Sequence, residues 1–343
     1  MKTGVREIAR RTGLSPATVS NALNHKRGTS RATIERVAAV ARDLGYQHPD
    51  EDIRRFAPKL DRIALVTARA TGKIVDTSRF RVALEEGVET QAKRHGLEPV
   101  FMSLDLSDRK AAKAHAQSLC KDRTTALVLL ATEMDERDYR FFDACEAPLV
   151  IVDGWSSVRP FECVVTTNQI SSYDAVSYLI RKHHDKIGYL AGSIRTKNYP
   201  LREEGYLRAL SDAGLVADPR CRLETGSSLE SAYAAVNDWV SGNPELPTAF
   251  FADNDILALG AMRAFAEHGI RVPEDVSLVG FDDLVFAAFS NPPLTTVRVP
   301  IHDMGELAVR KAVRQVRTPR NYKCITQVCT TFVERGTVRD LGR

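Results

Sequence analysis

From residue 61 onward, short apolar segments alternate with amphipathic ones, and this alternation limits the possible fold more than any other feature. Eight segments have the length and composition of buried strands: 62–67, 98–104, 125–130, 148–152, 163–166, 186–191, 248–252 and 276–280. Eight further segments have helical spacing of apolar residues: 80–95, 108–120, 135–145, 168–183, 201–213, 229–241, 255–268 and 302–316. Alternating strands and helices are typical of parallel sheets covered on both faces.

The number of strand candidates exceeds what one compact open sheet usually holds. We therefore predict an α/β body of two doubly wound lobes. In such sheets, ligands bind at the carboxyl ends of the strands, so a ligand cleft is expected between the lobes.

The first 47 residues predict a separate all-α domain of three short helices, 5–11, 16–24 and 30–44. A glycine turn, Gly13, separates the first two, as a helix-turn-helix requires. Ser15 and Ser30 are expected N-caps, and Pro16 stands at a first helical position, where its missing N–H costs nothing. The residues expected to face inward are Ile8, Ala9, Val19, Ala22, Leu23, Ile34, Val37, Ala38, Ala41 and Leu44.

Charge is distributed unevenly between this head and the rest of the chain. Residues 1–47 contain nine Lys or Arg and three acids, a net charge of +6, so the remaining residues carry −2 of the total +4. A basic head on a nearly neutral body is typical of nucleic-acid binding, although a basic surface that only faces solvent is the alternative.

Several function classes lack their signatures in this sequence. There is no apolar run near 18 residues and no signal-peptide core. We therefore expect no membrane span and a cytoplasmic location. No G-x-S-x-G, P-loop or H-E-x-x-H motif is present, so we do not expect an enzyme. His183 and His184 are adjacent and cannot share a helix face, so no metal site is predicted. No other cofactor is predicted either.

Six scattered cysteines contain no C-x-x-C pair: Cys120, Cys145, Cys163, Cys221, Cys324 and Cys329. Most lie in apolar surroundings, which favours buried free thiols over a disulfide or zinc framework.

Several segments, in this order and at these separations, resemble the LacI/GalR family of bacterial transcriptional repressors. They are 6–24, 29–46, 189–192, 201–210, 247–283, 292–300 and 333–337. The resemblance implies a three-helix head, a hinge and a two-lobed body similar to periplasmic sugar-binding proteins. It also implies a homodimer, or a dimer of dimers, that binds double-stranded operator DNA and a small-molecule effector.

The resulting domain prediction combines this resemblance with the change of pattern along the chain. It assigns 1–47 to the helix-turn-helix domain, 48–60 to the hinge, 61–165 plus 296–322 to the N-terminal lobe, and 166–295 plus 323–343 to the C-terminal lobe.

In a helix-turn-helix, the N-terminal side chains of the second helix meet base edges in the major groove. Here those residues are Pro16, Ala17 and Asn21. Ala17 can touch a thymine methyl, and Asn21 can pair with adenine, which is worth roughly 1–3 kcal/mol of discrimination. An ordinary exposed asparagine is the alternative for Asn21. The candidate phosphate contacts are Ser15, Thr18, Ser20, Asn24, Arg31 and Thr33.

The hinge departs from the family pattern. Relatives place a leucine wedge in the minor groove, whereas here Phe56 or Ile53 stands near that position, with Arg54 and Arg55 as groove contacts. Three acids, 50–52, would face phosphates, which is repulsive, unless they cap a hinge helix and point outward.

The resemblance also implies an effector site in the body. Arg202 matches an effector-binding arginine and Asp282 an acid that accepts ligand hydroxyls. The further implied site residues are Phe80, Arg81, Asp153 and Asn254. A salt bridge of Arg202 to Glu203 or Glu204 is the structural alternative. The resemblance implies a small polar effector, a sugar or sugar derivative. Arg81, Lys73 and Arg202 together favour an anionic one, such as a sugar phosphate or sugar acid.

Two other function classes fit a two-lobed α/β body. One is a sugar-binding protein and the other a sugar-metabolising enzyme, both without a DNA role. The basic head opposes the first and the missing catalytic motif opposes the second. The sequence therefore predicts a repressor in which an effector shifts the populations of two lobe orientations and so changes operator affinity.

Overall fold

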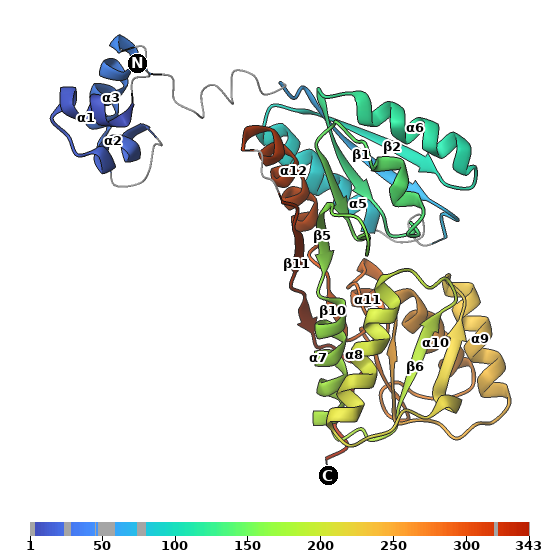
Figure 1. The fold of residues 1–343 in the computed structure, drawn as a ribbon. Coiled ribbons are helices and arrows are strands. Elements are labelled where there is room, and N and C mark those ends of the chain that lie inside the picture. Colours follow the sequence, from blue (N-terminus) through green and yellow to red (C-terminus); the bar gives the residue numbers. More distant parts are fainter. Residues whose placement is uncertain are drawn as a thin grey trace. The chain divides into compact units, whose positions relative to one another are not determined.

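The computed structural model describes residues 4–23, 29–44, 46, 59–73, 80–318 and 322–342. The chain forms two compact units, one of residues 1–58 with 316–319 and the other of residues 59–315 with 320–343. The first unit contains the helical head and the second the α/β body (Figure 1). The predicted hinge lies almost wholly outside the described residues.

The head consists of α1 (Val5–Thr12), α2 (Pro16–Leu23) and α3 (Arg31–Asp43). Gly13 ends α1 in the left-handed region at φ 67°, and its N–H donates to the carbonyl of Ala9. The expected core is confirmed at most positions, because its fully buried residues are Ile8, Ala9, Val19, Ala22, Val37 and Ala41. The prediction for Ala38 is wrong: it is exposed, because the buried stripe of α3 runs through positions 34, 37, 41 and 44.

The N-terminal lobe is built on a parallel sheet of order β11-β5-β4-β3-β1-β2. Its strands are β1 (Arg62–Arg69), β2 (Glu98–Asp105), β3 (Thr125–Leu130), β4 (Leu149–Val152), β5 (Glu162–Thr166) and β11 (Ile325–Val328). Alternate residues of β1 join two different hydrophobic clusters: Ile63 and Leu65 belong to one, Ala64 and Val66 to the other. Both faces of the sheet are therefore covered, as the alternation predicts.

The elements that cover this sheet are α5 (Phe80–Arg94), α6 (Arg109–Lys121), the 3-10 helix η1 (Asp138–Phe142) and α12 (Ile301–Arg317). Helices α5 and α12 lie side by side (Figure 1) at two glycines, Gly87 and Gly305. A Cβ atom at Gly87 would lie 2.1 Å from the carbonyl oxygen of His302, so only glycine permits this approach.

The C-terminal lobe has a four-stranded parallel sheet of order β7-β6-β8-β9. Its strands are β6 (Ile187–Gly192), β7 (Arg222–Thr225), β8 (Ala249–Ala252) and β9 (Ser277–Val279). Its helical elements are α7 (Asn168–Arg181), α8 (Asn198–Asp212), η2 (Pro219–Cys221), α9 (Leu229–Ser241), α10 (Asp255–Glu267) and α11 (Val285–Phe289). An antiparallel pair, β10 (Thr296–Arg298) with β12 (Thr331–Val333), completes the described strands.

Two short strands lie in a different lobe from the one predicted for their segments. In 323–343, predicted to belong to the C-terminal lobe, β11 pairs with β5 of the N-terminal sheet, whereas Thr337 further along donates to the carbonyl of Leu278 in β9. In 296–322, predicted to belong to the N-terminal lobe, β10 is linked to the other lobe by a bridge between Asp282 and Arg298, whereas α12 packs against α5 of the N-terminal lobe. Both strands flank the places where the chain crosses between lobes, and no local pattern marks such a crossing.

The predicted elements differ from the structure mainly where local signals are weak. The expected helix 135–145 is only the 3-10 helix η1, and α8 begins at Asn198 rather than at 201. Strands β7, β10, β11 and β12 were not predicted. They are three or four residues long, and β7, β11 and β12 are partly exposed, so they lack a continuous apolar run.

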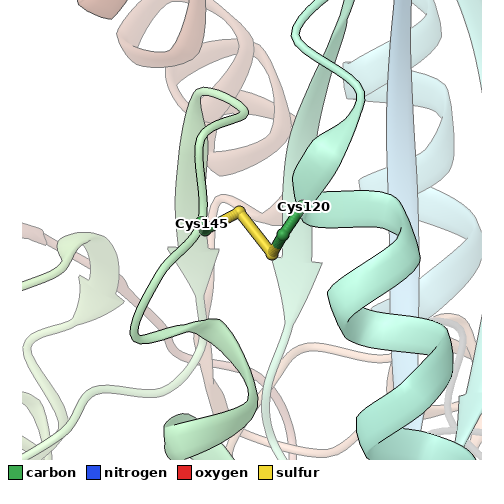
Figure 2. Close-up of a disulfide and its surroundings, with 2 residues drawn as sticks. All are labelled: Cys120 and Cys145. Atoms are coloured by element: carbon green, nitrogen blue, oxygen red, sulfur yellow. A yellow bond between two sulfur atoms is a disulfide. The ribbon is translucent and has the colours of Figure 1, made fainter.

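The expectation that no disulfide forms is wrong. Cys120 and Cys145 form a disulfide, with Cα atoms 4.5 Å apart and a sequence separation of 25. Figure 2 shows it joining the end of α6 to the loop before β4. Of the other cysteines, Cys163 and Cys221 are buried and free as expected, but Cys324 is half-buried and Cys329 exposed. The two cysteines are brought together by the tertiary structure, and their spacing in the sequence does not reveal the contact.

No described helix has both the length and the apolar character needed to cross a membrane.

Candidate functional site

The second helix of the head begins with a serine–threonine pair. The hydroxyl of Ser15 accepts a hydrogen bond of 3.0 Å from the N–H of Thr18 and lies 2.8 Å from the Thr18 hydroxyl. Helix α3 begins in the same way, with Ser30 accepting from the N–H of Thr33 at 3.2 Å. Both predicted N-caps are confirmed, and each fixes where its helix begins.

The outer face of α2 is open to solvent. Ser15, Pro16, Ala17 and Asn21 are exposed, whereas Thr18 and Ser20 are half-buried. Ala17 and Asn21 are four residues apart and so share one face of the helix, away from the buried Val19 and Ala22. This face can be laid against another surface without disturbing the core of the head.

Two of the arginines on the third helix, Arg31 and Arg36, have different environments. Arg31 is exposed and pairs with Glu35 at 3.0 Å, while Thr33 is half-buried. Arg36 donates a hydrogen bond of 2.8 Å to the carbonyl of Thr12, which ties α3 to the end of α1. The predicted contacts at Asn24, Arg54, Arg55 and Phe56 lie outside the described residues.

In the body, a chain of buried polar side chains begins at Asp153, directly after β4. One oxygen of Asp153 accepts from the Thr132 hydroxyl at 2.6 Å, and the other accepts from Asn198 Nδ2 at 2.8 Å. Asn198 Oδ1 in turn accepts from Asn168 Nδ2 at 3.0 Å. Asn198 belongs to the C-terminal lobe and Asp153 to the N-terminal lobe, so this chain crosses the boundary between lobes.

Arg202 occupies the centre of the same network and is 5% exposed. Its Nε donates to Asn168 Oδ1 at 2.9 Å and its Nη2 to Asp282 Oδ1 at 3.2 Å, while Nη1 donates to the carbonyl of Asp253. The guanidinium carbon lies 3.7 Å from the ring centroid of Phe281. Every nitrogen of the guanidinium group therefore has a protein acceptor, and the expected alternative partners, Glu203 and Glu204, are not among the acceptors found.

Glu203 is instead paired with two other arginines, Arg195 at 2.6 Å and Arg222 at 2.5 Å. Arg195 also donates to Asp253 at 2.6 Å. Asp253 is fully buried at the end of β8 and accepts a further hydrogen bond from the N–H of Gly192 at 2.8 Å.

Asn254 and Asp282 join the network from the same edge of the C-terminal sheet. Asn254 caps α10 by accepting from the N–H of Leu257 at 3.0 Å, and its amide donates to the hydroxyl of Tyr199 at 2.9 Å. Asp153 and Asp282 both have positive φ, 57° and 104°, a conformation that non-glycine residues seldom adopt outside special sites.

Burial changes the ionisation of these acids. It raises the pKa of Asp153 to about 6, although hydrogen bonds from Thr132 and the charge of Arg202 oppose the rise. Burial also raises the pKa of Asp253 to about 6 against the opposing charge of Arg195. Burial raises the pKa of Asp282 as well, and the facing charge of Arg202 limits that rise. Perturbed carboxyl groups gathered at one place are typical of functional sites.

The structure brings four of the six predicted site residues together: Asp153, Arg202, Asn254 and Asp282. The other two, Phe80 and Arg81, stand in the first turn of α5, where Phe80 packs against the core and Arg81 pairs with Glu85.

Sequence reasoning missed further members of the network, among them Asn168, Asn198, Tyr199 and Asp253. A signal for Asn198 exists, because it lies four residues before Arg202 on α8 and shares a face with it. Asp253 directly follows β8 and Asn168 stands two residues after β5, where the carboxyl ends of parallel strands gather polar groups.

Sequence comparisons match two family profiles. The profile described as "Bacterial regulatory proteins, lacI family" matches residues 5–49, and that of the "Periplasmic binding protein-like domain" matches residues 176–338. The HTH-type transcriptional repressor PurR of Vibrio atlanticus is 29% identical over 341 residues, which cover 98% of this chain and 99% of the relative. PurR of Pasteurella multocida is 27% identical and covers 98% of both chains.

Solved structures share the fold over nearly the whole chain. A complex of the transcriptional regulator CelR with cellobiose has a TM-score of 0.72 and 24% identity, covering 98% of this chain and 99% of that one. The lac repressor dimer bound to operator and the anti-inducer ONPF also has a TM-score of 0.72, with 23% identity, covering 99% and 100%.

Proposed function

This chain belongs to the LacI/GalR family of bacterial transcriptional regulators, and on that premise we propose that it binds a pseudo-palindromic operator as a homodimer controlled by a small polar effector. Its relatives are DNA-binding transcriptional repressors, and it is a DNA-binding regulator rather than an enzyme.

The observation that carries the effector proposal is the buried network around Arg202. Carboxylates of Asp153 and Asp282 can accept from ligand hydroxyls, while the guanidinium of Arg202 and the amide of Asn254 can donate to ligand oxygens. Few and convergent polar groups of this kind suit a polyhydroxyl compound such as a sugar.

The charges in this network favour a neutral sugar over a sugar phosphate. Arg202 is already balanced by Asp282, and Arg81 is already paired with Glu85 one turn along α5. A doubly charged phosphate would add to the negative charge of Asp153, Asp253 and Asp282.

Coupling between effector and operator follows from the contacts that cross the lobes. An effector seated among Asp153, Asn198 and Arg202 interacts with both lobes and favours one of their relative orientations. That preference changes the arrangement of the two heads in a dimer, and with it the operator affinity.

On the DNA side, we propose that Ala17 and Asn21 read bases in the major groove and that Pro16 lies against the same groove. Their exposure on one face of α2 supports this role. Ser15, Thr18, Ser20, Arg31 and Thr33 are proposed to contact phosphates, which position the head without reading sequence.

For the dimer, the supporting feature is an apolar cluster on α11. Phe286 is 60% exposed and Phe289 82% exposed, and Val285 beside them is also exposed. Neighbouring exposed aromatic side chains mark association surfaces more often than isolated ones do.

The test is selection of bound DNA from a random duplex library by the full chain, repeated for Asn21→Ala. We expect a palindromic motif, and for the variant a relaxed preference at one symmetric base pair. Ala39→Ser, an exposed change elsewhere in the head, is the matched control and should select the original motif. No enriched sequence would favour a sugar-binding protein without a DNA role, and an unchanged motif would remove Asn21 from base reading.

A further inference from the structure

Lys197 stands at the N-terminus of α8 and reaches from the C-terminal lobe to the N-terminal lobe. Its Nζ atom donates hydrogen bonds to Glu136 Oε2 at 2.9 Å and to the carbonyl of Trp155 at 2.5 Å. The same Nζ lies 4.9 Å from the ring centroid of Tyr139 and 5.5 Å from that of Trp155. An ammonium group between a carboxylate and aromatic rings is held by both charge and cation–π attraction.

Glu136, Tyr139 and Trp155 form a cage around the Lys197 ammonium group, and other residues of the N-terminal lobe hold Glu136 in place. Glu136 accepts from the hydroxyl of Ser156 and, at 3.0 Å, from the N–H of Ser157. Burial by itself would raise the pKa of Glu136, but hydrogen bonds from Ser156 and Lys197 lower it to about 2. The carboxylate is therefore ionised at any physiological pH and remains a fixed partner for a cation.

Tyr139 forms the second wall of the cage and is completely buried. Its position depends on a glycine, because a Cβ atom at Gly154 would lie 2.7 Å from the Tyr139 hydroxyl oxygen. Three consecutive residues thus take part in the two contacts that cross the lobes. Asp153 accepts a hydrogen bond from Asn198, and the carbonyl of Trp155 accepts one from Lys197. Gly154, between them, leaves room for Tyr139.

The cage and the candidate effector site share one element. Lys197 is followed directly by Asn198, and Arg202 lies one turn further along α8. Any shift of the start of α8 away from the N-terminal lobe must therefore withdraw Lys197 from the cage and Asn198 from Asp153 together.

We propose that Lys197 is a latch: its ammonium group, seated in the cage of Glu136, Tyr139 and Trp155, holds the two lobes closed on each other in the absence of effector. The regulatory part of this inference rests on the proposed function. An effector that rearranges the start of α8 either reinforces or releases the latch and so sets the lobe orientation.

The experiment measures the distance between the lobes directly in the full chain. Spin labels are attached at Lys113→Cys on α6 and Ser241→Cys on α9, both exposed positions, in a Cys324→Ser/Cys329→Ser background. Pulsed electron–electron double resonance then gives the distribution of distances between the two labels without DNA or effector. With Lys197 present we expect one narrow distribution.

Lys197→Met keeps the length of the side chain and removes its charge, and it should broaden the distribution and add longer distances. Glu136→Gln, which removes the charge from the other side, should give the same change, and Lys197→Arg should retain the narrow distribution. The matched control is Lys186→Met, because Lys186 is an exposed lysine of the same lobe paired with Glu245.

Distributions of Lys197→Met and Glu136→Gln that both superimpose on the wild type would overturn the latch. That result would leave the proposed function standing, since the measurement needs neither operator nor effector. With the selected operator, the affinity of Lys197→Met should differ at least fivefold from that of Lys186→Met, and equal affinities would overturn the regulatory part alone.

Discussion

Asn198 donates a hydrogen bond of 2.8 Å to Asp153, and this bond joins side chains of different lobes. Asn198 is 3% exposed and Asp153 6%, so the bond forms away from water, where a polar group without a partner is costly. The amide of Asn198 also connects to Asn168 and through it to Arg202. The lobe boundary and the candidate effector site are therefore one continuous polar structure.

Asp153→Asn should change the pH dependence of stability. The pKa of Asp153 is raised to about 6 in the folded protein, compared with about 4 in an unfolded chain. Between these values the folded state holds a proton that the unfolded state has lost, so the group favours folding at low pH and this advantage disappears as the pH rises through 6. The amide does not titrate, and the stability of the variant relative to wild type should rise by about 2 kcal/mol between pH 4.5 and 7.5.

Urea unfolding of both proteins at a series of pH values measures this difference. Asp275→Asn is the control, because hydrogen bonds from Arg271 hold the pKa of Asp275 below its usual range and outside the window. Parallel pH profiles for wild type and Asp153→Asn would contradict the prediction.

Arg202→Ala should destabilise the body strongly. It leaves Asp282 without its ion-pair partner and Asn168 without a donor, and removing one member of a buried pair costs about 3–5 kcal/mol. Arg202→Lys keeps the charge but loses the planar fork, so an intermediate loss is expected. Arg271→Ala removes an exposed pair with Asp275 and should cost less than about 1 kcal/mol in the same denaturant titration. Equal losses for Arg202→Ala and Arg271→Ala would refute a structural role for the network.

Arg31→Ala should weaken operator binding through the salt-dependent component. Arg31 is paired with Glu35 on the open surface of α3, and each phosphate contact contributes about one unit to the slope of log K against log salt. Fluorescence anisotropy with the selected operator at several salt concentrations should show the slope reduced by about one. Arg263→Ala, which removes a similar helical pair in the body, should leave it unchanged. An unaltered slope in Arg31→Ala would exclude its phosphate contact.

Phe289→Asp should weaken self-association. The side chain is 82% exposed, so the change removes little packing within one chain but places a carboxylate on each side of a two-fold interface. Sedimentation velocity over a range of concentrations should show a shift toward monomer. Val216→Asp, at an 89% exposed position elsewhere on the same lobe, is the control and should sediment as wild type. A variant that stays dimeric would place the interface away from α11.

The order of helices and strands was largely determined by the sequence itself. Apolar spacing and caps are local signals, so the helix over 229–241 was predicted with the bounds that α9 has, and Ser15 and Ser30 were identified as caps. Local signals failed where a segment depends on its neighbours. Residues 135–145 have helical spacing but form only a 3-10 turn, in which Asp138 accepts from the N–H of Asp135 at 2.9 Å.

Which polar residues meet was decided only by the tertiary structure. Arg202, Asp282, Asp153 and Asn254 were inferred through family resemblance, but Asn168 and Asn198 became part of the site because parallel strands end at one edge and the chain crosses between lobes there. The same holds for Lys197 in its cage and for the disulfide between Cys120 and Cys145. Side-chain periodicity reports which face of an element is buried, whereas contacts between distant residues depend on strand order and crossover, which no local pattern contains.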